Sequence, residues 1–408
     1  MKVLIVTENA YSGGLDTFLI TLINSWPNAE DELVLVCNAS HPGLSLVRRS
    51  LVRQCEVIGH DFPLPWTTEA ISRVRRLILF PFRFLWRQIL FVRYLGMFRD
   101  LFEQTAAGQL LVVNGGYPAG LTCRAATVAW GVAGKRPPSI HNFHNFSHPP
   151  RVWERPFEHV IDRLVYYYAG AMVSVSRICA VSLANRSAFL GLKKVTYIHN
   201  GISYRPARAS RAEVRAELGI PAEAQLMLML GTYEARKGHA FLLQAFKRVL
   251  DTLPSARLAI CGFGYPPEIE RVRAEVASLE LDDNVLLQGF REDVPDLLEA
   301  SDVLVVPSQA SESFGLTIVE AMSHFVPVIA TRVGGIPEVI QDDEGGYLVE
   351  HDDVDGLARR IVLLLTDEAL RHEQGRRGHA RFEANFRAER MARTYAELLQ
   401  RGHAEPFA

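Results

Sequence analysis

Short apolar runs alternate with helical stretches along this chain, and the whole alternation occurs twice. The first series opens with an apolar run at residues 3–6, a glycine-containing turn and helical spacing over residues 16–23. A second series starts at residues 225–230, after a polar stretch near 204–212 that is rich in Arg and Ala. Strands that alternate with helices form a parallel sheet with helices on both faces. The sequence therefore predicts an α/β chain with two doubly wound units.

The length agrees with two units, because single hydrophobic cores stop growing near roughly 250–300 residues and this chain has 408. We expect domains at residues 1–204 and 205–385, and a C-terminal helix at 386–408 that packs back across their junction. Further strands are predicted at 33–37, 110–114, 139–143, 171–174, 195–198, 257–261, 285–288, 303–306 and 326–330. Helices are predicted near 239–250, 267–279, 294–300, 316–324, 336–341 and 355–366, and in one long stretch over 369–401.

The cysteines and the N-terminus exclude several classes of protein. The five cysteines are scattered and form no CxxC pair, which argues against a disulfide framework and a structural zinc site. The opening MKVLIVTENA lacks the length and the small-residue cleavage site of a signal peptide, and we interpret it as a first strand. We therefore expect a cytoplasmic protein, with a peripheral place on the inner face of the membrane as the second expectation.

Charge is distributed unevenly although the net charge is only −2. Residues 1–204 contain 21 Lys and Arg against 13 Asp and Glu, which gives +8, and the remainder contains 23 against 33, which gives −10. A basic half suits an anionic partner such as a phosphate or a membrane surface. The alternative is that two domains have simply diverged in charge.

The segment from Arg73 to Arg99 contains seven arginines, no acidic residue and many bulky apolar side chains. Charge interrupts it too often for a span, which needs roughly 20 mostly apolar residues. An arginine-rich helix with Trp, Phe and Leu is typical of a membrane interface. The alternative is a core helix whose Arg side chains lie along the surface. We favour contact with an anionic membrane.

The segment SESFGLTIVEAM, residues 311–322, combines two glutamates with the start of a helix. Glu312 follows a predicted strand and Glu320 lies in the next predicted helix. Free backbone N–H groups at a helix N-terminus bind phosphate, and Gly315 allows a close approach of the backbone. Glu320 can accept hydrogen bonds from ribose hydroxyls, as acidic residues do in other nucleotide-binding α/β domains. The remaining residues expected at this helix start are Phe314, Leu316 and Thr317.

This segment resembles the E-x7-E motif of retaining glycosyltransferases of the GT-B fold, family 4. The flanking GFREDVPDLLEASDVLVVPSQ, PVIATRVGGIPEVI and GGYLV are similar as well, so the resemblance covers nearly the whole C-terminal half. It implies two Rossmann-like domains that face a cleft, an acceptor-side domain at 1–204 and a nucleotide-sugar-binding domain at 205–385. It also implies that Glu312 lies against the transferred sugar and that no metal or other cofactor is needed.

A second motif, GTYEARKGH at residues 231–239, places Arg236 and Lys237 just before a helix. Two cations there can neutralise a diphosphate leaving group. Family members commonly carry Arg directly after the first glycine, whereas this chain has Thr232; Lys237 matches the family's lysine. Phe290 and Arg291, which follow a predicted strand, are expected to border the base. An exposed basic turn is the plainer interpretation of the motif.

The N-terminal half supplies fewer candidates. In SIHNFHNFSHPP the family resemblance assigns His144 to the position that faces the transferred sugar, with His141 as the alternative. Gly14 belongs to a Gly13-Gly14 loop similar to the family's glycine loop, which contacts donor phosphates or the acceptor. Most Gly-Gly pairs are simple turns.

The resemblance implies a hexosyltransferase that takes a nucleoside-diphosphate sugar, UDP before GDP on family frequency, and that acts with retention. The expected acceptor is a glycan or lipid-linked molecule of surface polysaccharide, lipopolysaccharide or glycolipid synthesis, and no nucleic-acid partner is expected. The alternatives are a non-catalytic nucleotide-binding scaffold, which Thr232 favours, and a sugar-nucleotide epimerase of the same fold. A nicotinamide dehydrogenase is disfavoured because the first strand leads to YSGGLD and not to G-x-G-x-x-G.

Overall fold

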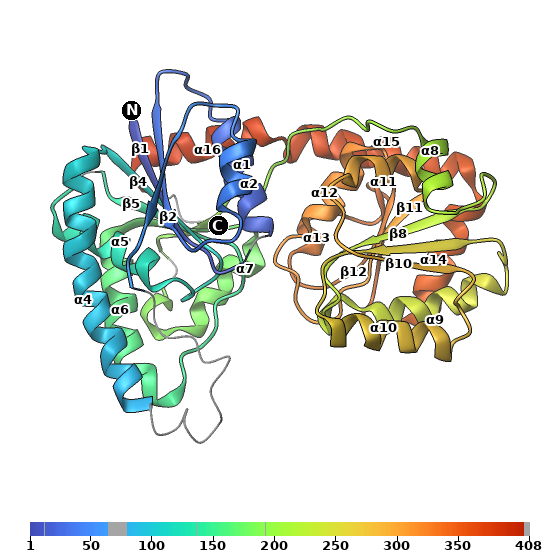
Figure 1. Ribbon diagram of the computed structural model, residues 1–408, viewed down its shortest axis with the longest axis horizontal. Coiled ribbons are helices and arrows are strands. Elements are labelled where there is room, and N and C mark those ends of the chain that lie inside the picture. The colour runs from blue at the N-terminus through green and yellow to red at the C-terminus, as the bar shows by residue number, and fades with distance from the viewer. Residues whose placement is uncertain (12, 64–79, 136, 192, 404–408) are drawn as a thin grey trace. The chain divides into compact units, whose positions relative to one another are not determined.

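The computed structural model describes residues 1–11, 13–63, 80–135, 137–191 and 193–403. Its contacts divide the chain into two compact units: Met1–His199 together with the segment from Ala388, and Asn200–Arg387 (Figure 1). The sequence placed these divisions after residues 204 and 385. The structure assigns the linker to the second unit because the Ile202 amide donates a hydrogen bond of 2.9 Å to the Phe386 carbonyl.

The first unit is built on a parallel sheet of seven strands in the order β3-β2-β1-β4-β5-β6-β7. The strands are β1 (Lys2–Glu8), β2 (Glu32–Asn38), β3 (Glu56–His60), β4 (Gln109–Asn114), β5 (Ser139–Phe143), β6 (Ala169–Ser174) and β7 (Val195–Tyr197). Strand order reverses between β1 and β4. Ligands of open α/β sheets bind outside the carboxyl ends of the strands at such a point.

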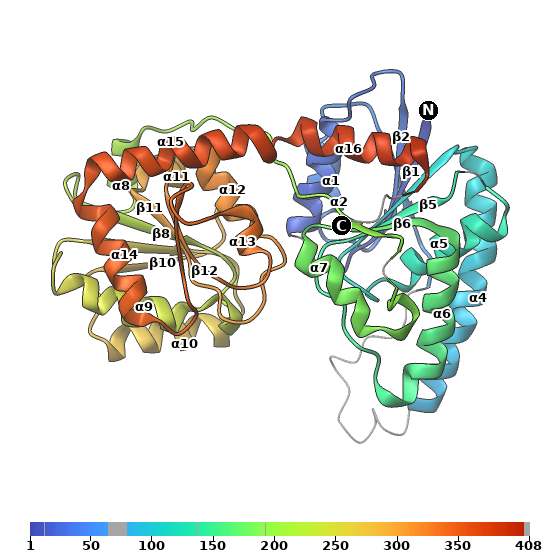
Figure 2. The same ribbon diagram turned by 180° about the vertical axis from the view of Figure 1, so that it is seen from behind.

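Helices cover both faces of this sheet, and successive strand residues pack on opposite faces (Figures 1 and 2). Val3 and Ile5 contact the layer of α1 and α16, whereas Leu4 and Val6 contact the layer of α4, α5 and α6. The helices are α1 (Gly14–Asn24), α2 (Leu44–Ser50), α4 (Phe80–Thr105), α5 (Leu121–Val132), η1 (Val152–Glu154), α6 (Arg155–Tyr168), α7 (Arg177–Val181), η2 (Ser182–Asn185), η3 (Ser187–Phe189) and α16 (Ala388–Arg401).

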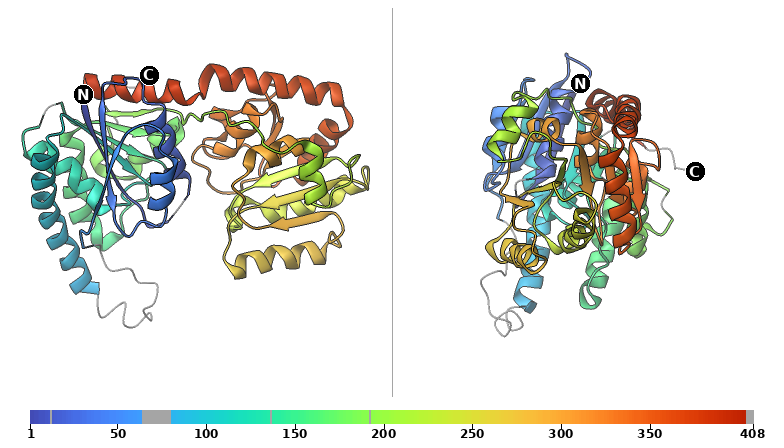
Figure 3. Two further views of the ribbon diagram at one scale, coloured as in Figure 1. Left: turned by 45° about the horizontal axis from the view of Figure 1, so that its top comes forward. Right: turned by 90° about the vertical axis from the view of Figure 1, so that its right-hand side faces the viewer.

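The second unit contains a parallel sheet of six strands in the order β10-β9-β8-β11-β12-β13, again with helices on both faces (Figure 3). The strands are β8 (Leu226–Leu230), β9 (Arg257–Cys261), β10 (Val285–Gln288), β11 (Val303–Val306), β12 (Val328–Thr331) and β13 (Gly346–Val349). The helices are α8 (Arg211–Glu217), η4 (Ala235–Lys237), α9 (His239–Leu250), α10 (Pro266–Ser278), α11 (Val294–Ala300), α12 (Leu316–Ser323), α13 (Ile336–Val339), α14 (Val354–Thr366) and α15 (Glu368–Asn385). The two doubly wound Rossmann-like units predicted from the sequence are thus confirmed.

The long helical stretch predicted over 369–401 is two helices. α15 packs on α12 within the second unit, and α16 packs on α1 within the first. Over the residues described, no helix is both long enough and apolar enough to cross a bilayer. All five cysteines are thiols.

Candidate functional site

The order of strands in the second sheet reverses between β8 and β11, and the loops that follow these two strands carry most of the predicted residues. One loop leads from β8 through η4 to α9, and the other leads from β11 to α12. The carboxyl ends of parallel strands meet at one edge of a sheet, so the two loops lie beside each other there. Distant parts of the sequence are thereby brought to one place.

Lys237 and Glu312 form an ion pair across these two loops, with 2.6 Å between Nζ and Oε2. Their side chains are 18% and 12% exposed, so the pair is largely shielded from water. Ser308, which directly follows Pro307 at the end of β11, places its hydroxyl 3.5 Å from the same carboxylate oxygen. The two charges predicted from separate motifs therefore meet in the structure.

The segment GGIPE holds the backbone of Glu312 in place. The Gly335 amide donates a hydrogen bond of 2.8 Å to the Glu312 carbonyl. Gly334 has a φ of 57°, and a Cβ added there would lie 2.1 Å from that same carbonyl oxygen. Only glycine fits at this position, since both the backbone conformation and the close approach exclude a side chain.

α12 begins directly after the loop that contains Glu312. Gly315 precedes it with a φ of 98°, and the backbone amides of Leu316 and Thr317 stand in its first turn, where N–H groups have no partner within the helix. Phe314 is buried and packs against the ring of Phe386 at 5.9 Å, so it supports the start of α12 from within the core.

Glu320 is the fifth residue of α12, and its carboxylate makes no hydrogen bond or ion pair with any residue in the described ranges. Burial raises the pKa of Glu320 to about 7, and the charge of Arg205 only partly opposes this shift. Glu320 is half-buried, and a carboxylate that is shielded from water without a partner costs stability. Such a group is typical of a functional site that awaits a ligand.

Arg236 is held by a carboxylate that the sequence analysis did not identify. Glu234 accepts hydrogen bonds from Arg236 Nε at 2.6 Å and from the Thr232 hydroxyl at 2.9 Å. Burial acts to raise the pKa of Glu234, but these bonds outweigh it and the pKa is lowered. Arg236 also donates to the Ser311 carbonyl at 3.3 Å, which connects it to the loop of Glu312.

Phe290 and Arg291, in the loop from β10 to α11, differ in their surroundings. Phe290 is 69% exposed, and its ring is open to a ligand. Arg291 is engaged on two sides by Asp293 and by Glu217, the latter at 2.6 Å. These hydrogen bonds raise the pKa of Arg291. A ligand contact by Arg291 would therefore have to break an existing ion pair.

In the first unit, His144 directly follows β5 at the carboxyl edge of the sheet. Its amide donates to the Asn114 carbonyl at 3.0 Å, and its ring packs edge-on against Phe18 at 4.2 Å. Nε2 is buried and has no partner in the described residues, and burial lowers the pKa of His144 to about 3. His141 lies inside β5, fully buried, with Nδ1 2.8 Å from the Thr127 hydroxyl. His144, not His141, is thus at the sheet edge.

The segment of Gly13 and Gly14 is held by a buried pair that was not predicted. Asp16 binds His41 Nε2 at 2.8 Å and the Gly13 amide at 3.0 Å. Both side chains are 1% exposed. No motif marks His41, which lies 25 residues from its partner.

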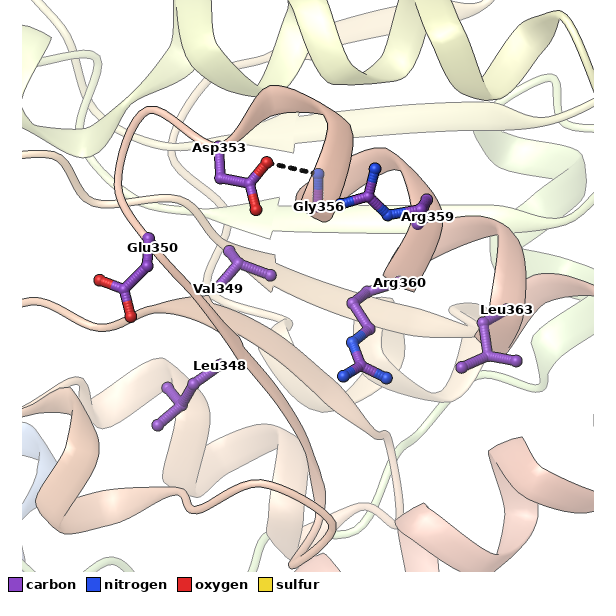
Figure 4. A pocket seen from close by; sticks show the side chains of 8 residues that line it. All are labelled: Leu348, Val349, Glu350, Asp353, Gly356, Arg359, Arg360 and Leu363. Atoms are coloured by element: carbon purple, nitrogen blue, oxygen red, sulfur yellow. Dashed lines mark hydrogen bonds between the residues drawn. The ribbon is translucent and has the colours of Figure 1, made fainter.

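A separate depression lies at the carboxyl end of β13 and the start of α14 (Figure 4). Two acidic side chains and the two arginines Arg359 and Arg360 line it. One acid, Asp353, caps α14 by accepting from the Gly356 amide at 2.8 Å, and the other, Glu350, pairs with Arg332. None of the predicted site residues lines this depression.

The chain has the two-domain GT-B fold. It matches the crystal structure of a glycosyltransferase from Rickettsia africae over 98% of each chain, with a TM-score of 0.78 and 17% identity. It also matches HepE of Anabaena, solved in complex with UDP, over 98% of this chain and 100% of that one, with a TM-score of 0.74 and 19% identity.

Residues 210–381 match the family described as Glycosyl transferases group 1, and the chain carries a domain of that family. Over 207 residues it is 34% identical to the N-acetyl-alpha-D-glucosaminyl L-malate synthase of Bacillus anthracis, which covers 50% of this chain and 53% of that protein. The chain spans about half the length of the relatives it matches. The glycosyltransferase relationship predicted from the E-x7-E segment is thereby confirmed for this domain.

Proposed function

We propose that this chain is a glycosyltransferase that moves a sugar from a nucleoside-diphosphate sugar to a glycan or lipid-linked acceptor. The observation that carries the proposal is the shielded Lys237–Glu312 pair, which lies at the reversal of strand order in the second sheet, beside the start of α12. A cation, an anion and free helix N–H groups at one sheet edge suit a diphosphate joined to a sugar.

The donor groups have separate partners in this proposal. Lys237, Arg236 and the first amides of α12 neutralise the diphosphate as it departs. Glu320 accepts hydrogen bonds from the ribose hydroxyls, which supplies the partner its buried carboxylate lacks. Phe290 borders the base. UDP is the first candidate because HepE, which shares the fold, was solved with UDP.

Glu312 is the proposed sugar contact of the second unit, and His144 is proposed from the family resemblance as that of the first unit. Glu312 binds the hydroxyls of the transferred sugar or stabilises positive charge at the anomeric carbon. In the reaction the bond from the anomeric carbon to the diphosphate breaks and a bond to an acceptor hydroxyl forms. A glycoside, a nucleoside diphosphate and one proton are released. Retention of configuration is part of the proposal and is supported by the family resemblance.

The acceptor is proposed to belong to surface polysaccharide, lipopolysaccharide or glycolipid synthesis. The support is the basic and aromatic segment at residues 73–99, of which residues 80–99 lie in the described part of α4 and residues 73–79 lie outside it. An anionic membrane surface is the proposed partner of this segment.

The reaction is tested by incubating the protein with UDP- and GDP-sugars and measuring released nucleoside diphosphate, with Glu312→Ala as the control. Release from one donor class by the wild type alone supports the proposal, and NMR of the product anomer decides retention. Interconversion of the sugar on an intact donor would instead indicate an epimerase. Tight nucleotide binding with no release under any condition would indicate a scaffold.

His144 is expected to stay neutral throughout the physiological pH range. Burial lowers its pKa to about 3, so between pH 5 and pH 8 it acts as a hydrogen-bonding imidazole and not as a cation. NMR of the imidazole nitrogens, assigned by comparison with His144→Gln, should show no titration of this ring in that range. A midpoint between pH 5 and pH 8 would contradict the proposed state.

Metal removal is expected to leave turnover unchanged. Lys237 and the N-terminus of α12 already supply positive charge where a divalent cation would otherwise screen the diphosphate. The measurement is nucleoside diphosphate release before and after treatment with excess EDTA. A loss of turnover that Mg²⁺ or Mn²⁺ restores would contradict the expectation.

A further inference from the structure

The side chain of His144 lies on the face of the first sheet that α1 and α16 cover. Successive strand residues point to opposite faces, and Ile140 and Asn142 of β5 precede His144 at spacings of two. Ile140 packs in the same apolar layer as residues of α1 and α16, whereas Phe143 packs with α5 on the other face. Asn142 and His144 are therefore the polar side chains that this end of β5 presents to α1 and α16.

Four side chains, those of Phe18, Asn142, His144 and Tyr395, form a closed chain of contacts that we call the Phe18 cluster. Asn142 Nδ2 donates a hydrogen bond of 2.6 Å to the Tyr395 hydroxyl. The Tyr395 ring packs edge-on against Phe18 of α1, with 5.7 Å between the centroids. Phe18 in turn packs edge-on against His144 at 4.2 Å. The backbone of β5 then leads from His144 back to Asn142, so the position of each member depends on the others.

Burial in the Phe18 cluster ends at His144. Asn142 and Tyr395 are fully buried and Phe18 is nearly so, whereas His144 is half-buried. Among the described residues, His144 Nε2 has no hydrogen-bonding partner, so packing and not a hydrogen bond of that nitrogen orients the ring. The ring of Phe18 supplies the aromatic part of that packing. The cluster therefore holds, from inside the core, the one of its four members that a ligand can reach.

An ordinary core contact is the alternative, and the hydrogen bond between Asn142 and Tyr395 argues against it. The layer around Tyr395 is built from apolar side chains of α1, α16 and the strands. Asn142 Oδ1 is buried there and has no partner among the residues described. Such an oxygen costs stability, and two apolar side chains of similar shape would fill the space without that cost. The pair is therefore better explained by the fixed orientation that a buried polar contact imposes.

We propose that Tyr395 is a positioning residue for His144, which it holds in place through Asn142 and Phe18. This inference rests on the proposed function, in which His144 contacts the transferred sugar, and deepens it. Tyr395 lies 253 residues from Asn142 in the sequence, on α16, the last helix of the described chain. The C-terminal helix thereby contributes to the proposed sugar contact, although it carries no residue of the predicted site.

Tyr395→Phe tests the proposal because it removes only the hydroxyl and leaves the ring against Phe18. With saturating donor, kcat for nucleoside diphosphate release should fall about 10- to 100-fold, the loss expected when a contacting group is misplaced by up to about 1 Å. The Kd for UDP should stay that of wild type, since the nucleotide is proposed to bind the second unit. The NMR resonances of the His144 ring, assigned by comparison with His144→Gln, should shift because its position relative to the Phe18 ring changes.

Two further variants separate positioning from stability. Tyr395→Phe leaves the Asn142 amide buried without a partner and should melt at a lower temperature, whereas Asn142→Leu/Tyr395→Phe removes both polar groups and should regain stability while kcat stays low. Trp26→Phe is the matched control. Trp26 belongs to the same apolar layer but follows the end of α1 at the amino edge of the sheet, where its Nε1 donates to Asp31 at 2.8 Å. This variant should lose stability and keep the kcat and the His144 resonances of wild type.

Unchanged His144 resonances in Tyr395→Phe would overturn the proposal. An equal loss of kcat in Trp26→Phe would also overturn it, because activity would then follow stability alone, and so would recovery of kcat in Asn142→Leu/Tyr395→Phe. The NMR measurement needs no turnover, so the two proposals fail separately. A wild type that releases no nucleoside diphosphate from any donor contradicts the transferase reaction, whereas shifted His144 resonances in Tyr395→Phe still support the placement of the ring by Tyr395.

Discussion

Replacing Lys237 or Glu312 is expected to lower kcat/KM for donor turnover by about 10²–10³-fold, the usual loss when one charge-stabilising group of a catalytic site is removed. The two side chains form one shielded ion pair, so each single substitution also leaves the other charge without its partner. Lys237→Ala/Glu312→Gln should therefore be little worse than the poorer single variant.

Steady-state kinetics of the two single variants and the double variant form the measurement. Lys247→Ala is the matched control, since Lys247 lies on α9 of the same unit and pairs with Glu280 at 3.7 Å on the surface. It should turn over like wild type. Losses that simply multiply in the double variant would show that the two residues act independently and would contradict the proposed unit.

Glu320→Gln is expected to weaken nucleotide binding and, at the same time, to stabilise the free protein at alkaline pH. A hydrogen bond to a charged group contributes about 1.5–3 kcal/mol, so the Kd for the nucleotide should rise roughly 10- to 150-fold. The affinity of the wild type should increase as pH rises through 7, because the ionised carboxylate is the better acceptor for ribose hydroxyls.

The stability of the free wild-type protein changes with pH in the opposite direction to its nucleotide affinity. The pKa of Glu320 is about 7 in the folded protein against an ordinary value of 4.5, so the folded state holds a proton that the unfolded state releases between these values. Stability is therefore lost as pH rises from about 4.5 to 7. Glu320→Gln should match wild type near pH 4.5 and melt several degrees higher at pH 8, at about 2–4 °C per kcal/mol.

Melting curves across this pH range, with and without UDP, measure both effects. Glu299→Gln, an exposed residue of α11, is the control and should follow wild type at every pH. A lower melting temperature of Glu320→Gln at pH 8 would mean that the carboxylate stabilises the free protein and has a partner there.

Much of the fold could be predicted from periodicity. Physical features of the remaining elements explain why they were not predicted. β3 was missed because Glu56 and Gly59 interrupt its apolar pattern and most of the strand is only half-buried. β13 was missed because it begins at a pair of glycines, Gly345 and Gly346, both with positive φ. The break between α15 and α16 at Phe386 carries neither Gly nor Pro to mark it.

The site could be predicted only in its parts. The sequence indicated Lys237 and Glu312 separately, but their contact spans 75 residues and depends on the order of strands in the sheet. The engagement of Arg236 by Glu234 is local, and the alternating charges of the motif were a signal for it. Glu320 has no hydrogen-bonding partner among the described residues. This depends on which side chains the tertiary fold brings near its carboxylate, and sequence spacing does not determine that.

We expect the second unit to bind a nucleoside diphosphate at the reversal of its strand order. A thermal-shift panel of UDP, GDP, ADP and their sugar conjugates tests it most directly, because a ligand that binds only the folded state raises the melting temperature by mass action. We expect one nucleotide class, UDP first, to stabilise the wild type and to stabilise Glu320→Gln far less. No shift with any nucleotide, or equal shifts in both proteins, would contradict it.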